Sequence, residues 1–206
     1  MLRNNLKLAG VSAIVLGALA TSANAETLTV PATVAVDNSI NFTLTGSLDF
    51  GIVRATVDNT AGNCVGITLP ANPASALNST LGTAAAAACT GAGTAVLQNV
   101  GGTPARPSLQ VAGLAPFTAL TLTLPAAPVD LVLNPAPTGA PVLRLFDFTA
   151  YQTSGTPAAV TTTVTADASG AIAFNVGATL TTDPGTPTLT YENTTYTGDF
   201  DVTVTY

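Results

Sequence analysis

The chain has 206 residues, 5 Lys and Arg against 11 Asp and Glu, a formal net charge of −6 and no histidine. Such an acid excess argues against nucleic acid as a partner, because phosphates are neutralised by Lys and Arg. The lack of histidine excludes Ser-His-Asp triads, Cys-His pairs and His-ligated zinc or copper.

The first 25 residues have the three parts of a secretory signal peptide. Arg3 and Lys7 are followed by an apolar run over 8–20, and Ala23-Asn24-Ala25 is a small-x-small cleavage site. The run is short for a membrane span, which needs about 20 apolar residues. We expect cleavage after Ala25, which leaves 181 residues with a net charge of −8 and no membrane span. The mature chain is then exported to the periplasm, cell surface or exterior of a bacterium.

Short runs of alternating apolar and polar residues, rich in Thr and Val and separated by Gly and Pro, predict β-strands. The predicted strands are 28–36, 40–44, 48–55, 65–69, 94–99, 109–111, 119–124, 142–149, 160–165, 171–176, 178–182 and 198–206. Many short strands with no long amphipathic helix indicate an all-β fold, an immunoglobulin-like or pilin-like β-sandwich with long loops. We expect one such domain over 26–206.

The segment 60–93 is low in complexity and contains the only two cysteines, Cys64 and Cys89. In an exported chain the default expectation is a disulfide that staples this loop. A redox or metal pair is disfavoured because there is no C-x-x-C spacing. Within the loop, 83–88 is the one helix-prone stretch. The proline-rich segment 125–141 is expected to be an edge segment or an extended loop.

Carboxylates give little support for a metal or for catalysis. Asp49, Asp147, Asp199 and Asp201 could supply calcium ligands, but no EF-hand or nonapeptide calcium repeat is present. Paired carboxylates for glycoside hydrolysis would have to come from the two glutamates, Glu26 and Glu192, and Glu26 lies at the predicted mature terminus. We therefore expect no catalytic residues, no metal, no cofactor and no enzyme activity.

Three Thr-x-Thr stretches, at 121–123, 163–165 and 203–205, are of the kind found on ice-binding surfaces. Those surfaces need a flat array at regular spacing, and these stretches are scattered along the sequence. Strand propensity of threonine is the simpler interpretation.

Two motifs together resemble a family. Leu48-Asp49-Phe50-Gly51-Ile52-Val53 is similar to an L-[DN]-F-G-x-[IV] opening, and the segment 196–206, Y-T-G-D-F-D-V-T-V-T-Y, to a Y-x-G-x-[FY]-x-V-T-V-x-Y ending. In this order, behind a signal peptide, they resemble domain of unknown function family 4402, which is similar to spore coat protein U and chaperone–usher pilin-like subunits. The match covers both ends of the chain, and the middle by composition alone. One departure is that Tyr206 is the last residue, whereas pilins usually carry this tyrosine one place earlier.

The resemblance implies a structural or adhesive surface subunit that self-assembles, or binds a periplasmic chaperone, by β-strand complementation. Possible complementation residues are Leu28, Val30, Ala32, Val34, Val36, Phe200, Val202, Val204 and Tyr206. Alternatively, both termini are ordinary strands of a complete sandwich. A second functional hypothesis is a monomeric binding module for a glycan or surface polymer, which would need exposed rings from the phenylalanines or from Tyr151, Tyr191, Tyr196 and Tyr206.

Overall fold

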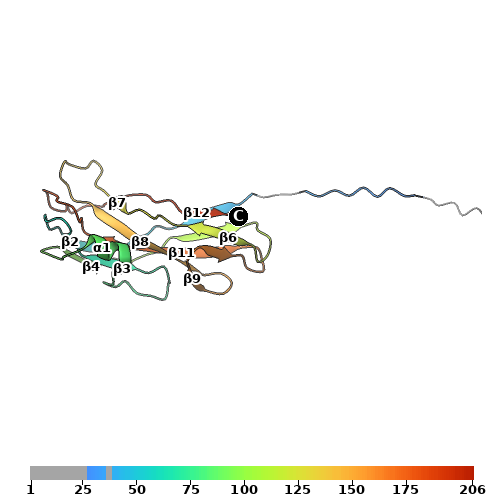
Figure 1. Cartoon of the computed structure of the whole chain (residues 1–206), viewed down its shortest axis with the longest axis horizontal. Coiled ribbons are helices and arrows are strands. Elements are labelled where there is room, and N and C mark those ends of the chain that lie inside the picture. The colour runs from blue at the N-terminus through green and yellow to red at the C-terminus, as the bar shows by residue number, and fades with distance from the viewer. Residues whose placement is uncertain (1–26, 36–38) are drawn as a thin grey trace, which may run out of the picture. The chain divides into compact units, whose positions relative to one another are not determined.

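The computed structural model describes residues 27–35 and 39–206, and residues 39–206 form one compact unit (Figure 1). That unit is built from short antiparallel strands with one six-residue helix among the residues described. The elements are β1 (Asn41–Thr45), β2 (Ile52–Thr56), β3 (Gly66–Leu69), α1 (Thr83–Ala88), β4 (Val96–Gly101), β5 (Ser108–Ala112), β6 (Ala119–Thr123), β7 (Val129–Leu131), β8 (Leu143–Gln152), β9 (Ala158–Val160), β10 (Thr163–Thr165), β11 (Ile172–Thr181) and β12 (Thr203–Thr205).

The strands form three antiparallel sheets. The largest has the order β1-β5-β11-β8-β7, with β3 added on β11 and β9 added on β8. A second sheet has the order β10-β6-β12, and β2 and β4 form a third. The predicted all-β class is confirmed.

Strand β11 is the centre of the largest sheet. Along one edge its first half pairs with β5 and its second half with β3, while its other edge pairs with β8. Gly177 lies where the partner changes from β5 to β3. A Cβ added there would lie 2.2 Å from the carbonyl oxygen of Leu69 and 2.4 Å from the amide nitrogen of Ala71. Only glycine lets the chain after β3 approach β11 this closely.

A β-bulge faces this point from strand β8. The register shifts between Gly177 and Thr179, and Asp147 adopts a left-handed φ of 48°. Asp is one of the few residues that tolerate this conformation. The Asp147 carboxylate accepts hydrogen bonds of 2.9 Å from the backbone N–H groups of Ala84 and Ala85, at the start of α1. The bulge therefore turns a strand residue into the cap of a helix that has no cap from its own preceding residue.

Two hydrophobic clusters lie on the largest sheet. The first combines β5, β8 and β11 with β6 and β10, and the second combines β3, β8 and β11 with β4. Phe174, Val111 and Val164 are fully buried in the first cluster, and Leu69, Leu145 and Leu180 are almost fully buried in the second. Side chains of the largest sheet thus serve both clusters.

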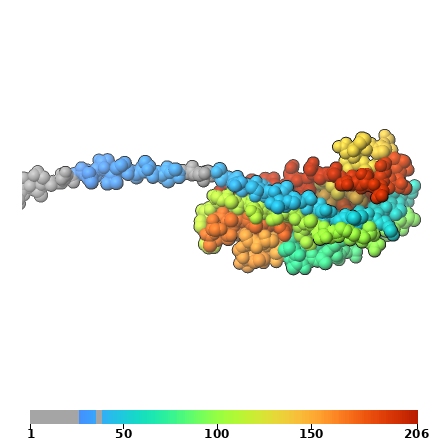
Figure 2. Space-filling model, turned by 180° about the vertical axis from the view of Figure 1, so that it is seen from behind, coloured from blue at the N-terminus to red at the C-terminus, as the bar shows by residue number. Residues whose placement is uncertain are grey.

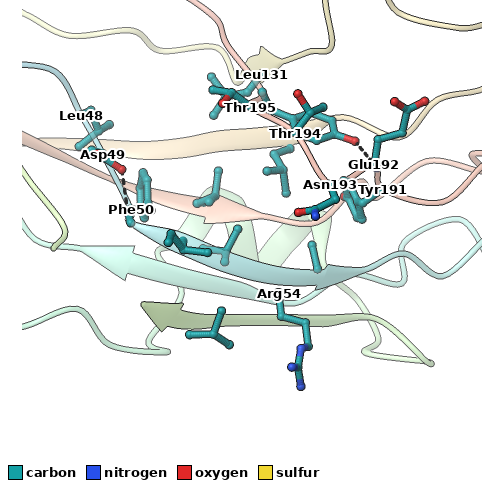
Figure 3. A pocket seen from close by; sticks show the side chains of 18 residues that line it. Leu48, Asp49, Phe50, Arg54, Leu131, Tyr191, Glu192, Asn193, Thr194 and Thr195 are labelled. Carbon is teal, nitrogen blue, oxygen red and sulfur yellow. Dashed lines mark hydrogen bonds between the residues drawn. The ribbon is translucent and has the colours of Figure 1, made fainter. Parts of the chain in front are cut away.

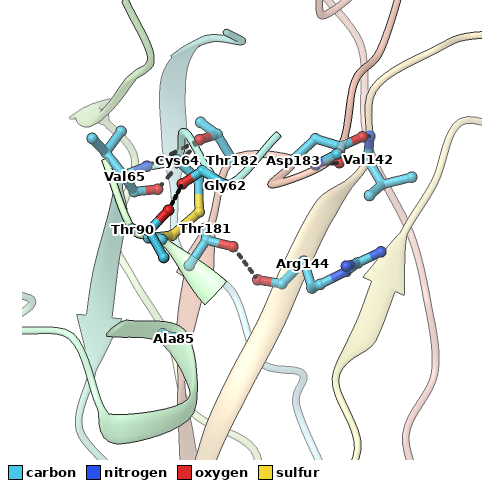
Figure 4. The surroundings of a disulfide bond; sticks show 12 residues. Gly62, Cys64, Val65, Ala85, Thr90, Val142, Arg144, Thr181, Thr182 and Asp183 are labelled. Atoms are coloured by element: carbon cyan, nitrogen blue, oxygen red, sulfur yellow. Dashed lines mark hydrogen bonds between the residues drawn. A yellow bond between two sulfur atoms is a disulfide. The ribbon is translucent and has the colours of Figure 1, made fainter. Parts of the chain in front are cut away.

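The predicted disulfide between Cys64 and Cys89 is present, with 25 residues of sequence separation (Figure 4). Closing a loop of this length is worth about 3–4 kcal/mol in the chain-entropy model. The Asp58 carboxylate stabilises the same region. It accepts hydrogen bonds of 2.8–3.1 Å from the backbone N–H and hydroxyl of Thr94, from the backbone N–H of Thr60 and from the side-chain amide of Asn63. These bonds, those from Thr94 and Thr60 foremost, hold the pKa of Asp58 well below its ordinary value of 3.8.

Several predicted elements differ from the observed ones. The predicted strand 28–36 is wrong for its described part, since residues 27–35 form no helix or strand, and Val36 lies outside the described residues. The predicted strand 160–165 is divided between β9 and β10 in two different sheets, whereas 171–176 and 178–182 merge into β11. Of the predicted strand 198–206, only β12 pairs as a strand. The expected helix-prone stretch is α1, and the proline-rich segment contributes the edge strand β7.

The substitution Gly177→Ala tests the close approach at β11. Overpacking against backbone atoms is expected to lower the free energy of unfolding by about 1–3 kcal/mol. Gly101→Ala, where the added Cβ has its nearest neighbour at 3.8 Å, is the control and should stay within about 0.5 kcal/mol of the wild type. Urea unfolding at pH 7 measures the stability of both variants. Equal midpoints for the two variants would contradict the conclusion that only glycine fits at position 177.

Asp58→Asn tests the contribution of the Asp58 carboxylate, which accepts four hydrogen bonds from Thr60, Asn63 and Thr94. Because the folded-state pKa is depressed, the contribution of Asp58 is fully present above its unfolded value and is lost as the pH falls through the folded value. We expect Asp58→Asn to be clearly less stable than the wild type at pH 7, with the difference shrinking progressively below about pH 4. Urea unfolding at a series of pH values measures it; a difference that does not change with pH would show that the charge is unimportant.

Candidate functional site: an open groove between strand edges

An apolar groove with a volume of about 340 Å³ lies between β1 and the segment 198–202 that leads into β12. Phe42 and Leu44 of β1 contribute to one wall, and Phe200 and Val202 to the other. Leu44 is 64% exposed, and Phe42 is 37% exposed although its ring stacks on that of Phe174, so β1 presents large apolar side chains that the described residues cover only in part. This apolar groove is a place where the hydrophobic layer is open to solvent.

A second depression, the mixed groove, has a volume of about 570 Å³ and lies between β2 and the segment 191–196 (Figure 3). Apolar side chains such as Phe50, Leu143 and Leu180 line it together with polar residues of 191–196. Figure 3 shows Arg54 pointing away from the segment 191–196, so its cation does not face Glu192. The mixed groove therefore offers no paired charges for binding an ion.

The two grooves adjoin each other. Leu48 and Leu131 line both, and each wall is formed by consecutive parts of the chain. Figure 2 shows the cyan segment that contains β1 running beside the red C-terminal segment. We call the two grooves together, which are bounded by residues 42–55 on one side and 191–202 on the other, the composite groove.

The segments that line the composite groove belong to, or lead into, strands at sheet ends. β1 ends the largest sheet, β12 ends the three-stranded sheet, and β2 has β4 as its sheet partner. An end strand carries a row of backbone N–H and C=O groups on its outer side, which is a template for another strand. The apolar groove thus combines an exposed hydrophobic floor with nearby strand edges, the two elements of β-augmentation.

A turn in the L-D-F-G motif carries the chain from β1 to β2. Gly51 has a φ of 77°, and its backbone N–H donates a hydrogen bond of 2.7 Å to the Asp49 carboxylate. The amide of Asn99 in β4 donates to the carbonyl oxygen of Phe50 at 2.7 Å. This motif therefore moves one wall of the composite groove from the largest sheet to the β2–β4 pair.

The N-terminal complementation residues are exposed. Leu28, Val30 and Val34 have 85%, 77% and 86% of their surface accessible, and Ala32 is also exposed. The segment 27–35 thus presents alternating apolar side chains to solvent with no strand partner among the residues described.

The C-terminal complementation residues are placed differently. Phe200, Val202 and Val204 are partly buried and pack on the first hydrophobic cluster, and the Phe200 ring lies 4.8 Å from that of Phe148. Tyr206 is 64% exposed. Three of these four side chains therefore complete the protein's own core, and Phe200 and Val202 also line the apolar groove.

Two tyrosines fix the wall of the mixed groove. The Tyr191 hydroxyl accepts a hydrogen bond from the Asp183 N–H and donates one to the Val142 carbonyl oxygen, both 2.8 Å. Burial raises the pKa of Tyr191 above its ordinary value. Tyr196 packs edge-on against Tyr191, with ring centroids 5.6 Å apart, and accepts a hydrogen bond from the Glu192 N–H. Their hydroxyl groups are thus already engaged within the protein.

The candidate calcium ligands do not gather. Within 27–35 and 39–206 there is no group of three or more His, Cys, Asp or Glu side chains that could hold a metal ion. Asp49 and Asp147 bind backbone N–H groups, and Asp199 and Asp201 are exposed. Of the two glutamates considered for hydrolysis, Glu192 is exposed at the mixed groove and Glu26 lies outside the described residues.

Among the described residues no helix is long and apolar enough to cross a membrane. Comparison of the chain with protein-family models, with curated proteins and with solved structures gave no match. The geometry of the composite groove therefore carries the functional argument.

Reasoning from the sequence missed the composite groove. Phe42 and Leu44 alternate with threonines, which predicts a half-buried strand, yet every residue of β1 is exposed. Leu131, which lines both grooves, comes from the proline-rich segment. Nothing in the local pattern distinguishes a covered apolar face from an uncovered one, because the difference depends on whether a neighbouring strand is present.

Tyr191→Phe tests whether the wall of the mixed groove depends on the hydroxyl. The change leaves the Asp183 N–H and the Val142 carbonyl without their partner, and we expect the free energy of unfolding to fall by about 1–3 kcal/mol. Tyr206→Phe, at an exposed position, is the control and should have no measurable effect. Thermal and urea unfolding measure both; a Tyr191→Phe variant as stable as the control would mean that water replaces the hydroxyl.

Proposed function

We propose that this protein is an exported, non-enzymatic structural or adhesive subunit of a bacterial surface, which assembles by β-strand complementation. Its fold is taken to be an immunoglobulin-like, pilin-like sandwich that lacks one strand, as the resemblance to domain of unknown function family 4402 implies. The observation that carries the proposal is the composite groove, in particular its apolar part between β1 and the segment 198–202, which is open to solvent near strand edges.

The proposed occupant is the segment 27–36 of a second copy of the chain. Its side chains alternate in the period of a β-strand, with Leu28, Val30, Ala32 and Val34 on one face. That face matches an apolar groove, and the exposed Leu28, Val30 and Val34 supply the hydrophobic area that binding would bury. Pro31 falls on the opposite face and removes one backbone donor, which an added edge strand tolerates.

Other features agree with this role. The Cys64–Cys89 disulfide suits an oxidising compartment. A periplasmic chaperone would cover the same groove until a second copy replaces it. The alternative of a glycan-binding module has less support, because the rings at the mixed groove, Tyr191 and Tyr196, are partly buried and use their hydroxyl groups internally.

Deletion of residues 26–36 tests the proposal. We expect residues 26–206 to form polymers and residues 37–206 to stay monomeric, measured by light scattering and electron microscopy. A synthetic peptide of residues 26–36 should bind the truncated chain one to one and raise its melting temperature. A peptide with Val30 and Val34 replaced by Asp is the matched control, since charge in an apolar groove is unfavourable.

Variants of the groove wall distinguish specific binding of the peptide from non-specific hydrophobic association. Leu44→Asp places a charge in the apolar groove and should abolish peptide binding, whereas Leu189→Asp changes an exposed leucine that does not line either groove and should not. Normal polymerisation of the truncated chain, or equal binding by both variants, would refute strand complementation.

A further inference from the structure

The three Thr-x-Thr stretches that are scattered in the sequence lie side by side in the three-stranded sheet. Thr121 of β6 is opposite Thr163 of β10 on one side and Thr205 of β12 on the other. Thr123 is opposite Thr203, and Thr165 is opposite Ala119. The stretches lie in strands, as the strand propensity of threonine predicts, and although they are scattered along the sequence they are neighbours in the sheet. We call the outward residues the threonine grid: Thr121, Thr123, Thr163, Thr165, Thr203 and Thr205.

All six side chains of the threonine grid are exposed. Residues on one face of a strand repeat at about 6.7 Å, and neighbouring strands lie about 4.8 Å apart. The grid therefore presents hydroxyl and methyl groups at a regular spacing in two dimensions. The row Thr163, Thr121, Thr205 crosses the whole sheet, and the pair Thr123 and Thr203 repeats it one step along.

The residues beneath the grid hold it rigid. Leu120, Leu122 and Val164 alternate with the threonines and are 1%, 3% and 0% exposed, in the first hydrophobic cluster. Threonine is β-branched and has a restricted χ1 angle, so its hydroxyl and methyl groups are held in a few orientations. Binding of a ligand to the grid therefore costs little conformational entropy of the threonine side chains.

The grid itself is neutral, as are most strands of this chain. No residue of β6, β10 or β12 is charged. The nearest acidic residue along the chain from β12 is the exposed Asp201, two residues before Thr203, where the alternation of exposed and partly buried side chains puts it on the same face as the grid. A charged side chain would keep its own hydration shell. A neutral array of methyl and hydroxyl groups can instead order water at the spacing of the sheet, which is comparable to the oxygen repeats of crystalline water. The grid contains no aromatic ring or carboxylate, as a sugar site would require.

We propose that the threonine grid binds ice. Water molecules held between the methyl groups and hydrogen-bonded to the hydroxyls of the grid join the lattice at its growing face. Because the sheet has three strands and adjacent strands twist by about 20–25°, the flat area is small. The activity expected is therefore inhibition of ice recrystallisation and incorporation into growing ice, with little depression of the freezing point. This inference does not depend on strand complementation.

Thr121→Tyr tests the proposal at the centre of the grid, because a ring there breaks the flat surface between Thr163 and Thr205. Thr56→Tyr, at an exposed threonine of β2 in another sheet, is the matched control. The wild-type chain of residues 26–206 and the control should enter a slowly growing ice hemisphere and keep ice grains small, whereas Thr121→Tyr should lose most of both effects.

Circular dichroism and thermal unfolding establish that each variant is folded. If Thr121→Tyr fails to fold, Thr163→Tyr in the end strand β10 takes its place, with the same expected loss. Exclusion of the wild-type chain from ice to the same extent as a non-binding protein of similar size, or equal ice activity of the grid variant and Thr56→Tyr, would overturn the proposal.

Discussion

The close packing of three strands around β11 is the constraint on which the rest of the fold depends. β11 pairs with β5, β3 and β8, and the change of partner at Gly177 is possible because a glycine admits the chain that follows β3. The opposing bulge at Asp147 absorbs the change in register and caps α1. From this centre the largest sheet extends to β1, which is where the hydrophobic layer becomes open.

The open edge at β1 links packing to the proposed function. A protein that exposes Phe42 and Leu44 beside a strand edge that no strand of the described residues pairs has both the hydrophobic surface and the backbone template for another strand. The exposed segment 27–35 carries a matching alternation of apolar residues. In the proposed assembly each chain supplies the strand that its neighbour lacks, and the burial of these apolar side chains stabilises the contact.

Sequence patterns predicted the features that depend on neighbouring residues in the chain, namely several strands, the helix and the disulfide. The alternation at 119–124 and 142–149, the helix-prone alanines and the Cys64–Cys89 pair all correspond to observed features. Sequence patterns did not show which strands become neighbours. For that reason, they missed the composite groove and treated the threonines of β6, β10 and β12 as unrelated. The segment 28–35 has a strand pattern without being a strand, because alternation provides a face to bury and not the partner that buries it.

Cysteine cross-linking between two differently tagged chains tests the central claim most directly. One chain carries Val30→Cys and the other Leu44→Cys, and the native disulfide is left intact. Strand complementation predicts a heterodimer under mild oxidation, which Leu189→Cys in place of Leu44→Cys does not give. No cross-link between chains, or a cross-link only within a chain that carries both substitutions, would show that the groove is not completed by a second copy.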